Sequence, residues 1–344
     1  MPKSDPSSQE VARRAALIDK LQRGWTNDRD ERTIAELFVG TTGPTLTALK
    51  KAIDAGDDYH DLHQLLYHDI DAPSLREQLL SHFREHAHPT GELKVLSDVD
   101  DTFYCSWIDA RYPKYIVYPG VRALYHELDI GASDDERGLG DLVFLTARPY
   151  DAYGATDRVT HELLHRHGVS RSVVLAGDFA HLLSNQLIAE EKHKRFLELA
   201  PLFPEYDYVF LGDSGQGDHI AGEMMLAHPS VRAVFIHDVV GTPELERAEH
   251  RARRLYFHDT YLGAACQAFS LGLISLAGLV RVARAAVAEL VDIEFASPEQ
   301  QEAMLAHFRR DLATLNELLP EAEHIDPRVL PPPPARPPSS VSLP

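Results

Sequence analysis

The stretch Leu-Lys-Val-Leu-Ser-Asp-Val-Asp-Asp-Thr, residues 93–102, decides the fold class of this chain. The apolar residues Leu93, Val95 and Leu96 predict a short strand that ends just before two carboxylates, Asp98 and Asp100. On an extended segment, side chains two residues apart point the same way, so these carboxylates are expected to face a common pocket. Two anionic groups in one pocket are costly unless a metal ion or a proton compensates. The stretch therefore predicts a strand that ends at a chemically active site.

Four further apolar segments continue the strand pattern, at residues 142–145, 173–175, 208–211 and 231–236. Amphipathic stretches between them, such as 159–167, 192–199 and 220–227, predict helices. Alternation of strands and helices favours a parallel sheet with right-handed crossovers, which is an α/β fold. Ligands of such folds bind at the carboxyl ends of the strands. Asp98, Thr146 and Asp213 each follow a predicted strand, so we expect all three at one edge of the sheet.

Composition bounds the class of protein. The 344 residues carry 34 Lys and Arg against 53 Asp and Glu, a formal net charge of −19, which argues against binding to nucleic acid or to an anionic membrane through a broad basic face. The hydrophobic fraction of 44% and the charged fraction of 25% are those of a soluble globular protein. Cys105 and Cys266 lack metal-ligand spacing, and the first ten residues are polar, so we expect a reducing, cytoplasmic setting.

Four regions are predicted along the chain: a helical N-terminal region at 1–91, a catalytic domain at 92–242, a C-terminal helical region at 243–325, and a proline-rich disordered tail at 326–344. Residues 261–280 are nearly all apolar or small. Their length is close to that of a membrane span, but glycines and serines interrupt them. A buried or interfacial helical hairpin is favoured over a spanning helix, which leaves peripheral membrane contact through this segment as an expectation.

Four elements with chemical potential stand in a fixed order. They are Asp98-Val-Asp100-Asp-Thr, Phe144-Leu-Thr146-Ala-Arg148-Pro, Glu191-Lys192-His-Lys194-Arg, and Leu-Gly-Asp213-Ser-Gly-Gln-Gly-Asp218. Each alone is common in proteins, and the order of all four is specific. Together they resemble the haloacid dehalogenase (HAD) superfamily of phosphohydrolases. Over residues 92–240 the chain resembles, more narrowly, the catalytic domain of App1-type phosphatidate phosphatases and the related lipin-type (LNS2) domains.

The resemblance implies a role for each motif residue. Asp98 would attack phosphorus and form an aspartyl-phosphate, and Asp100 would serve as general acid and then base. Mg²⁺ would be held by Asp98, the backbone carbonyl of Asp100, and Asp213, with Asp218 supporting the ion or its waters.

Two further residues receive roles toward the substrate from the same resemblance. Thr146 would hydrogen-bond a phosphoryl oxygen, and Lys192 would neutralise charge on the phosphoryl group. The spacing from Phe203-Pro204 favours Lys192, with Lys194 as the alternative. Arg148 is interpreted either as a substrate contact or as a surface ion pair.

Two departures from the family pattern leave the substrate open. The second motif has Thr146-Ala-Arg148-Pro-Tyr where the family usually has Ser followed by Ser/Arg-Pro-Trp. The N-terminal region is predicted to be helical, whereas many App1-like chains have a β-rich region beside the catalytic domain. Residues 149–191 leave little room for a large cap domain, and an open site suits a bulky substrate. We therefore expect a Mg²⁺-dependent phosphomonoesterase acting on phosphatidate or a related lipid headgroup. The alternatives are a phosphatase of a soluble ester or phosphoprotein, and a phosphatidate-binding module without turnover.

Overall fold

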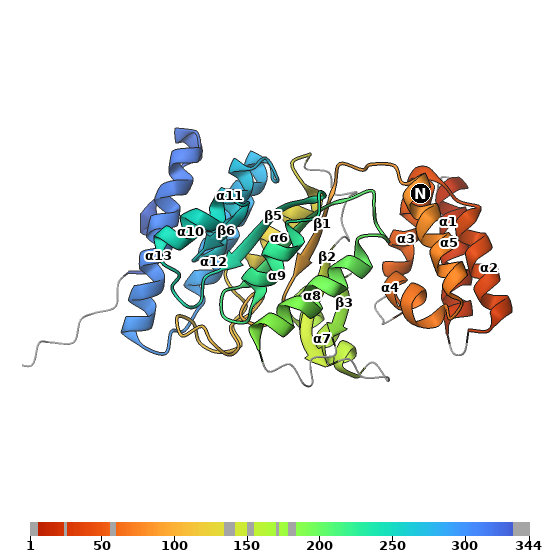
Figure 1. The fold of residues 1–344 in the computed structure, drawn as a ribbon. Helices are drawn as coiled ribbons and strands as arrows, with labels where there is room; N and C mark the ends of the chain where they lie inside the picture. The colour runs from red at the N-terminus through yellow and green to blue at the C-terminus, as the bar shows by residue number, and fades with distance from the viewer. Residues whose placement is uncertain are drawn as a thin grey trace, which may run out of the picture. The chain divides into compact units, whose positions relative to one another are not determined.

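The structure is a computed structural model that describes residues 6–23, 26–55, 60–133, 142–149, 155–169, 172–177 and 184–332 (Figure 1). Its strands are β1 (Leu93–Ser97), β2 (Leu142–Pro149), β3 (Ser172–Gly177), β4 (Asp207–Asp213), β5 (Val231–His237) and β6 (Leu255–His258). The helices before β1 are α1 (Pro6–Gln22), α2 (Asp28–Val39), α3 (Gly43–Asp54), α4 (Leu62–Gln64), which continues as a π-helical turn (Leu65–Asp69), and α5 (Pro73–His86). Those between strands are α6 (Val121–Ile130), α7 (Ala155–Arg166), α8 (Asn185–Leu199), α9 (Asp218–Met225) and α10 (Glu244–Arg251). The last are α11 (Tyr261–Ser270), α12 (Leu276–Val291) and α13 (Pro298–Leu318).

The strands form one six-stranded sheet in the order β3-β2-β1-β4-β5-β6. The outer pairs β2–β3 and β5–β6 are parallel, as strand–helix alternation predicts. The prediction of an α/β fold with a parallel sheet and helical flanks is confirmed. Because β1 and β4 are neighbours, the residues that follow these two strands meet at one edge of the sheet.

Two compact units divide the chain. Unit 1 comprises residues 1–96, 138–209 and 220–232, and unit 2 comprises residues 97–137, 210–219 and 233–344. The four regions predicted from the sequence follow other boundaries and stay a prediction. Of the predicted tail, residues 327–329 form a short 3-10 turn, and residues 333–344 lie outside the described part of the chain.

In unit 1, the N-terminal helices pack on one another and on the segment between α8 and β4. Lys50 of α3 is completely buried, and its Nζ donates to Glu205 Oε2 at 2.7 Å and to the carbonyl of Leu202 at 2.8 Å. Burial lowers the pKa of Lys50 to about 8, although the charge of Glu205 opposes this shift. Thr47 also donates to Glu205, at 2.9 Å. This buried ion pair ties the N-terminal helices to the segment that leads into β4.

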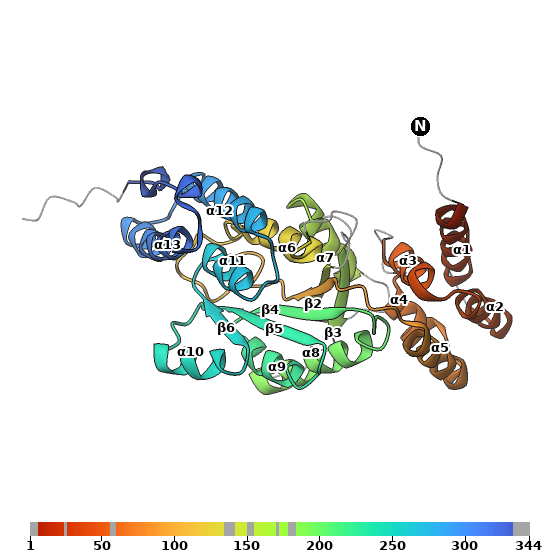
Figure 2. The ribbon, with the colours of Figure 1, turned by 90° about the horizontal axis from the view of Figure 1, so that it is seen from above.

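In unit 2, α11 is the central helix and contacts α6, α12, α13 and β6. In Figure 2, α11 and α13 lie on one side of β6 and α10 on the other. Residues 261–280 form α11, a turn with Gly272 at a φ of +70°, and the start of α12, so the predicted helical hairpin is confirmed; most of α11 is buried, and Leu271 and Leu276 are exposed. Among the described residues, none of the helices combines the length and the apolar character that crossing a bilayer requires.

The structure corrects two further predictions. The region 243–325 was expected to be helical, yet Leu255–His258 form β6. These residues become a strand by pairing in parallel with the edge of β5. Thr146 was expected just past its strand, but it lies inside β2, where the register with β3 shifts between Thr146 and Pro149.

Candidate active site

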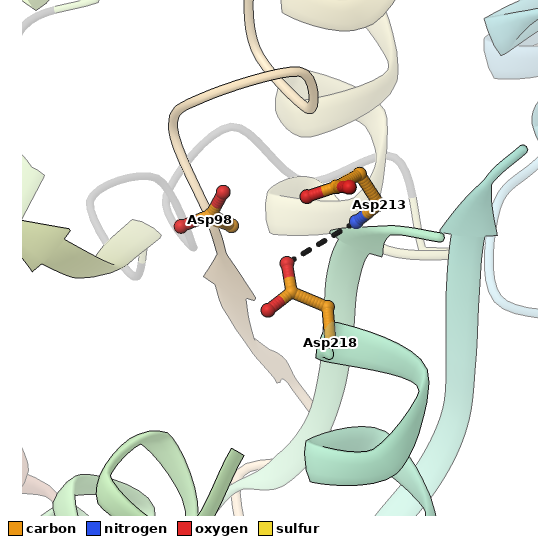
Figure 3. Close-up of side chains that lie close together, drawn as sticks. All are labelled: Asp98, Asp213 and Asp218. Atoms are coloured by element: carbon orange, nitrogen blue, oxygen red, sulfur yellow. Dashed lines mark hydrogen bonds between the residues drawn. The ribbon is translucent and has the colours of Figure 1, made fainter. Parts of the chain in front are cut away.

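Three carboxylates meet at the carboxyl ends of β1 and β4. Asp98 directly follows β1, Asp213 is the last residue of β4, and Asp218 is the first residue of α9. All three side chains are buried, and each offers an oxygen within 4.8 Å of the others, as Figure 3 illustrates. Three buried carboxylates at this separation repel one another, so the cluster requires a cation or bound protons. Because Mg²⁺ prefers carboxylate oxygens as ligands, this donor set fits the ion that the sequence motifs imply.

The backbone holds these carboxylates together. The amide of Asp98 donates to the carbonyl of Leu211 at 2.9 Å, which aligns the ends of β1 and β4. The amide of Asp213 donates to Asp218 Oδ2 at 3.2 Å (Figure 3). A Cβ at Gly212 would stand only 2.5 Å from Asp218 Cβ and 2.6 Å from its Oδ2. Position 212 therefore has to be glycine for the first turn of α9 to approach β4 this closely.

Asp100 has a different environment from Asp98. Asp98 is buried and Asp100 is only partly buried, and Asp100 Oδ1 accepts a hydrogen bond from the hydroxyl of Tyr104 at 2.7 Å. Because β1 ends at Ser97, the alternation of side chains along a strand does not apply to these two residues. The expectation that both carboxylates face one pocket rested on that alternation. The carboxylate of Asp100 is not among the three that cluster.

Asp101 organises the loop that follows. Its Oδ1 accepts from the amide of Ser106 at 2.8 Å, and its Oδ2 accepts from the amides of Trp107 at 3.0 Å and Ile108 at 2.8 Å. The residue is fully buried and has a φ of +54°, a left-handed conformation that Asp tolerates better than most residues. Asp101 therefore stabilises the loop that follows Asp98 and Asp100 by accepting hydrogen bonds from three of its backbone amides.

The other predicted site residues lie in unit 1. Thr146 and Arg148 belong to β2, and their side chains lie outside the described part of the structure. Lys192 of α8 is 1% exposed, whereas the side chain of Lys194 is 59% exposed and pairs with Glu191 at 3.7 Å. A buried ammonium group needs a compensating partner, whereas an exposed one is solvated by water. Burial therefore favours Lys192 over Lys194 as a site residue. The roles of Thr146, Arg148 and Lys192 stay predictions.

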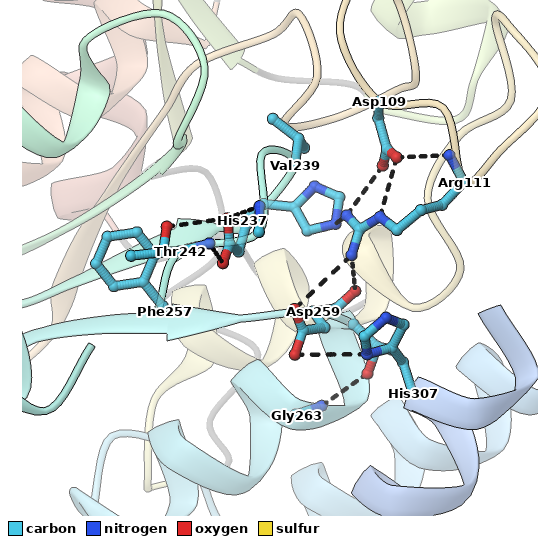
Figure 4. A network of polar contacts seen from close by, with 12 residues as sticks. Asp109, Arg111, His237, Val239, Thr242, Phe257, Asp259, Gly263 and His307 are labelled. Atoms are coloured by element: carbon cyan, nitrogen blue, oxygen red, sulfur yellow. Dashed lines mark hydrogen bonds and ion pairs between the residues drawn. The ribbon is translucent and has the colours of Figure 1, made fainter. Parts of the chain in front are cut away.

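A hydrogen-bonded relay that sequence reasoning missed joins Asp109, Arg111 and His237 (Figure 4). His237, at the end of β5, contacts the carbonyl of Asp101 through Nδ1 at 3.0 Å and Arg111 Nη2 through Nε2 at 2.9 Å. A carbonyl can only accept and a guanidinium can only donate, so His237 is neutral with its proton on Nδ1. Burial, with the charge of Arg111, lowers the pKa of His237 to about 4. Asp109 completes the relay by accepting from Arg111 Nε at 2.9 Å and Nη2 at 3.0 Å.

Asp259 connects this relay to the C-terminal helices. It follows β6 and accepts from Arg247 Nη2 of α10 at 2.8 Å and from Arg310 Nη2 of α13 at 2.7 Å. Its backbone carbonyl accepts from Arg111 Nη1 at 3.3 Å. Burial opposes its ionisation, but the hydrogen bonds of His307 and Arg247 outweigh burial and hold the pKa of Asp259 well below its usual range. No local motif marks these residues, because their partners are far apart in sequence.

Comparison with known proteins identifies the middle of the chain. Residues 93–238 match the family model described as "Phosphatidate phosphatase APP1, catalytic domain". The chain matches no curated protein and no solved structure. The matched segment runs from the first residue of β1 to just past β5, and so contains the carboxylate cluster and all four sequence motifs. This match confirms the resemblance seen in the motifs and supports a phosphatidate phosphatase-like activity.

Proposed function

We propose that this protein is a Mg²⁺-dependent lipid phosphatase of the HAD type, with phosphatidate as substrate class. The observation that carries the proposal is the cluster of Asp98, Asp213 and Asp218 at the ends of β1 and β4, within a segment that matches a phosphatase family. A carboxylate that must be both nucleophile and neighbour of two other carboxylates needs charge compensation, and a divalent cation supplies it. Asp98, Asp213 and Asp218 are the residues that would hold the ion.

In the proposed mechanism, an Asp98 oxygen attacks phosphorus, and the bond from phosphorus to the lipid oxygen breaks. Asp100 donates a proton to that leaving oxygen, which departs as the diacylglycerol hydroxyl. Asp100 then accepts a proton from water as the water oxygen attacks phosphorus, and the bond to Asp98 breaks to release inorganic phosphate. The hydrogen bond from Tyr104 keeps the carboxylate of Asp100 on the loop in a defined orientation. When bound, the cation would neutralise charge on the nucleophile and the phosphoryl oxygens.

The experiment is a phosphate-release assay on purified protein with and without Mg²⁺. Substrates are short-chain phosphatidate in micelles, a sugar phosphate and a nucleotide monophosphate. Asp98→Asn is expected to abolish release, because the amide is not a nucleophile. The matched control is Asp207→Asn, which alters a partly exposed carboxylate of β4 paired with Arg232.

The outcomes separate the alternatives. Release from phosphatidate that depends on Mg²⁺ and on Asp98 supports the proposal. Release confined to soluble esters would replace phosphatidate with a soluble substrate, and phosphatidate binding without any release would indicate a binding module. Full activity of the Asp98→Asn variant would show that the nucleophile is assigned wrongly.

A further inference from the structure

The loop after the active-site carboxylates exposes large aromatic side chains. Among the described large apolar residues, three are more than 70% exposed: Trp107 at 75%, Tyr115 at 72% and Leu245 at 76%. Trp107 and Tyr115 lie on one loop, residues 101–118, and Ile108 beside them is 38% exposed. Single exposed apolar residues are ordinary on protein surfaces, but several on one loop at a catalytic site mark a contact surface.

Hydrogen bonds hold the backbone of this loop in place. The backbone amides of Trp107 and Ile108 both donate hydrogen bonds to Asp101 Oδ2, which fixes this part of the loop. The amide of Tyr115 donates to the carbonyl of Cys105 at 2.7 Å. Tyr115 has a φ of +66°, which is uncommon for a residue with a bulky side chain. Such backbone strain concentrates at functional sites. The fold therefore maintains Tyr115 in an exposed and unfavourable conformation.

On one side, the exposed surface is joined to the predicted general acid. The ring of Tyr115 stacks on that of Tyr104, with 6.5 Å between the ring centroids. The hydroxyl of Tyr104 donates to Asp100 Oδ1 at 2.7 Å. The exposed aromatic ring is thus one side chain removed from the carboxylate that would protonate the leaving group.

On the other side, the exposed surface is joined to the carboxylate cluster. A Cβ on Gly215 would collide with Ile108 Cδ1 and would lie 3.0 Å from Asp213 Oδ1. The amide of Gly215 donates to that same oxygen at 2.6 Å. Val239 borders Gly215 as well, because its Cγ2 would be 3.3 Å from the same Cβ. Ile108 and Asp213, a predicted metal ligand, therefore both lie next to Gly215.

Charge distinguishes this surface from the rest of the chain. The net charge of the chain is −19, yet residues 106–118 contain one acid, Asp109, which is buried and bonded to Arg111. Lys114 is exposed on the same segment. Amphipathic Trp and Tyr side chains with a neighbouring cation are the composition of proteins that bind at the membrane–water interface. The exposed aromatic side chains and Lys114 therefore fit the interface of a lipid layer with anionic headgroups.

We propose that Trp107, Ile108 and Tyr115 form an interfacial anchor that enters the headgroup layer of a lipid surface and brings phosphate headgroups to the Asp98 site. This inference rests on the proposed function for the identity of the headgroup. It places membrane contact on the loop after β1, and not on residues 261–280, which form the buried α11 and the start of α12.

The test compares vesicle binding with hydrolysis. Flotation with vesicles of phosphatidylcholine and phosphatidate is measured for Trp107→Ala, Tyr115→Asn and the control Leu245→Ala. Asparagine is chosen at position 115 because it accepts a positive φ, so a loss of binding cannot come from backbone strain. The control removes an equally exposed apolar side chain from α10. Each loop variant is expected to bind vesicles about tenfold more weakly, and its ratio of vesicle to monomeric phosphatidate hydrolysis is expected to fall by a similar factor.

A spectroscopic measurement reports directly on the loop. The sequence contains two tryptophans, Trp25 and Trp107, so Trp25→Phe leaves Trp107 as the only indole. Its fluorescence is expected to shift to shorter wavelength on addition of vesicles. The anchor would be overturned if the fluorescence did not shift and if the loop variants bound vesicles, and hydrolysed the phosphatidate in them, as well as Leu245→Ala does. Vesicle binding that depends on Trp107 in a protein that hydrolyses no phosphatidate would support the anchor and overturn the proposed function. A wild-type protein that hydrolyses monomeric phosphatidate but does not bind vesicles would also overturn the anchor.

Discussion

Asp101→Asn tests whether one buried carboxylate holds the active-site loop. Asparagine accepts a positive φ at least as well as aspartate, so the substitution leaves the backbone conformation at φ +54° unstrained. What changes is the ability to accept hydrogen bonds. The aspartate accepts three amides with its two oxygens, whereas asparagine has one oxygen and an NH₂ group that can only donate.

The magnitude follows from these three bonds. If the amide oxygen takes the position of Oδ2, it keeps the Trp107 and Ile108 amides, and the NH₂ group then faces the amide of Ser106. A buried donor left without an acceptor costs about 1–3 kcal/mol. The two remaining bonds change from a charged to a neutral acceptor, at about 0.5–1 kcal/mol each. The free energy of unfolding is therefore expected to fall by about 2–5 kcal/mol.

The assay is urea denaturation followed by circular dichroism, together with phosphate release at saturating substrate. Asp207→Asn is the reference, because the exposed ion pair between Asp207 and Arg232 contributes at most about 1 kcal/mol. Activity of Asp101→Asn is expected to fall as well, since Asp100 is the residue directly before this loop. Equal stabilities of the two variants would refute the assignment of Asp101 as the residue that fixes the loop.

Three other predictions concern buried groups. Lys50→Met should lower the free energy of unfolding by about 3–5 kcal/mol because Glu205 is left buried without its cation, and adding Glu205→Leu should recover part of that loss; urea denaturation of both variants measures this. His237 has a pKa of about 4 against an ordinary 6.5, so the unfolded chain takes up this proton first as the pH falls. Its contribution of about 3 kcal/mol is complete above pH 6.5 and lost toward pH 4, and His237→Gln should flatten the dependence of stability on pH across that window. Gly212→Ala should reduce activity and Mg²⁺ affinity about tenfold or more by pushing Asp218 away, which calorimetric titration of Mg²⁺ checks, and unchanged affinity would contradict the close packing.

The strands that carry the active site were predictable because their signal is local. Each of the five predicted strands is a short apolar run, and these runs lie within β1 to β5. A polar motif at the end of such a run identifies the edge of the sheet where chemistry takes place. For this reason Asp98, Asp213 and Asp218 could be named before their proximity was known.

Other features depend on partners that no local pattern announces. Leu255–His258 become a strand only by pairing with β5. The relay from His237 to Arg111 joins residues 126 positions apart in sequence. Asp101 lies next to Asp100 in an acidic motif, and only its backbone conformation and three amide contacts distinguish it as structural.

By itself, the sequence indicated the α/β class, the family resemblance and the position of the carboxylate motif. These follow from strand periodicity and from the order of a few polar residues, both of which are properties of the chain alone. Only the tertiary structure decided which carboxylates share a site, which one supports the loop, and which apolar residues stay exposed. Burial and exposure result from packing between distant segments, and Trp107 is an example. A large aromatic residue is usually buried, but the packing of this chain leaves Trp107 75% exposed beside the candidate active site.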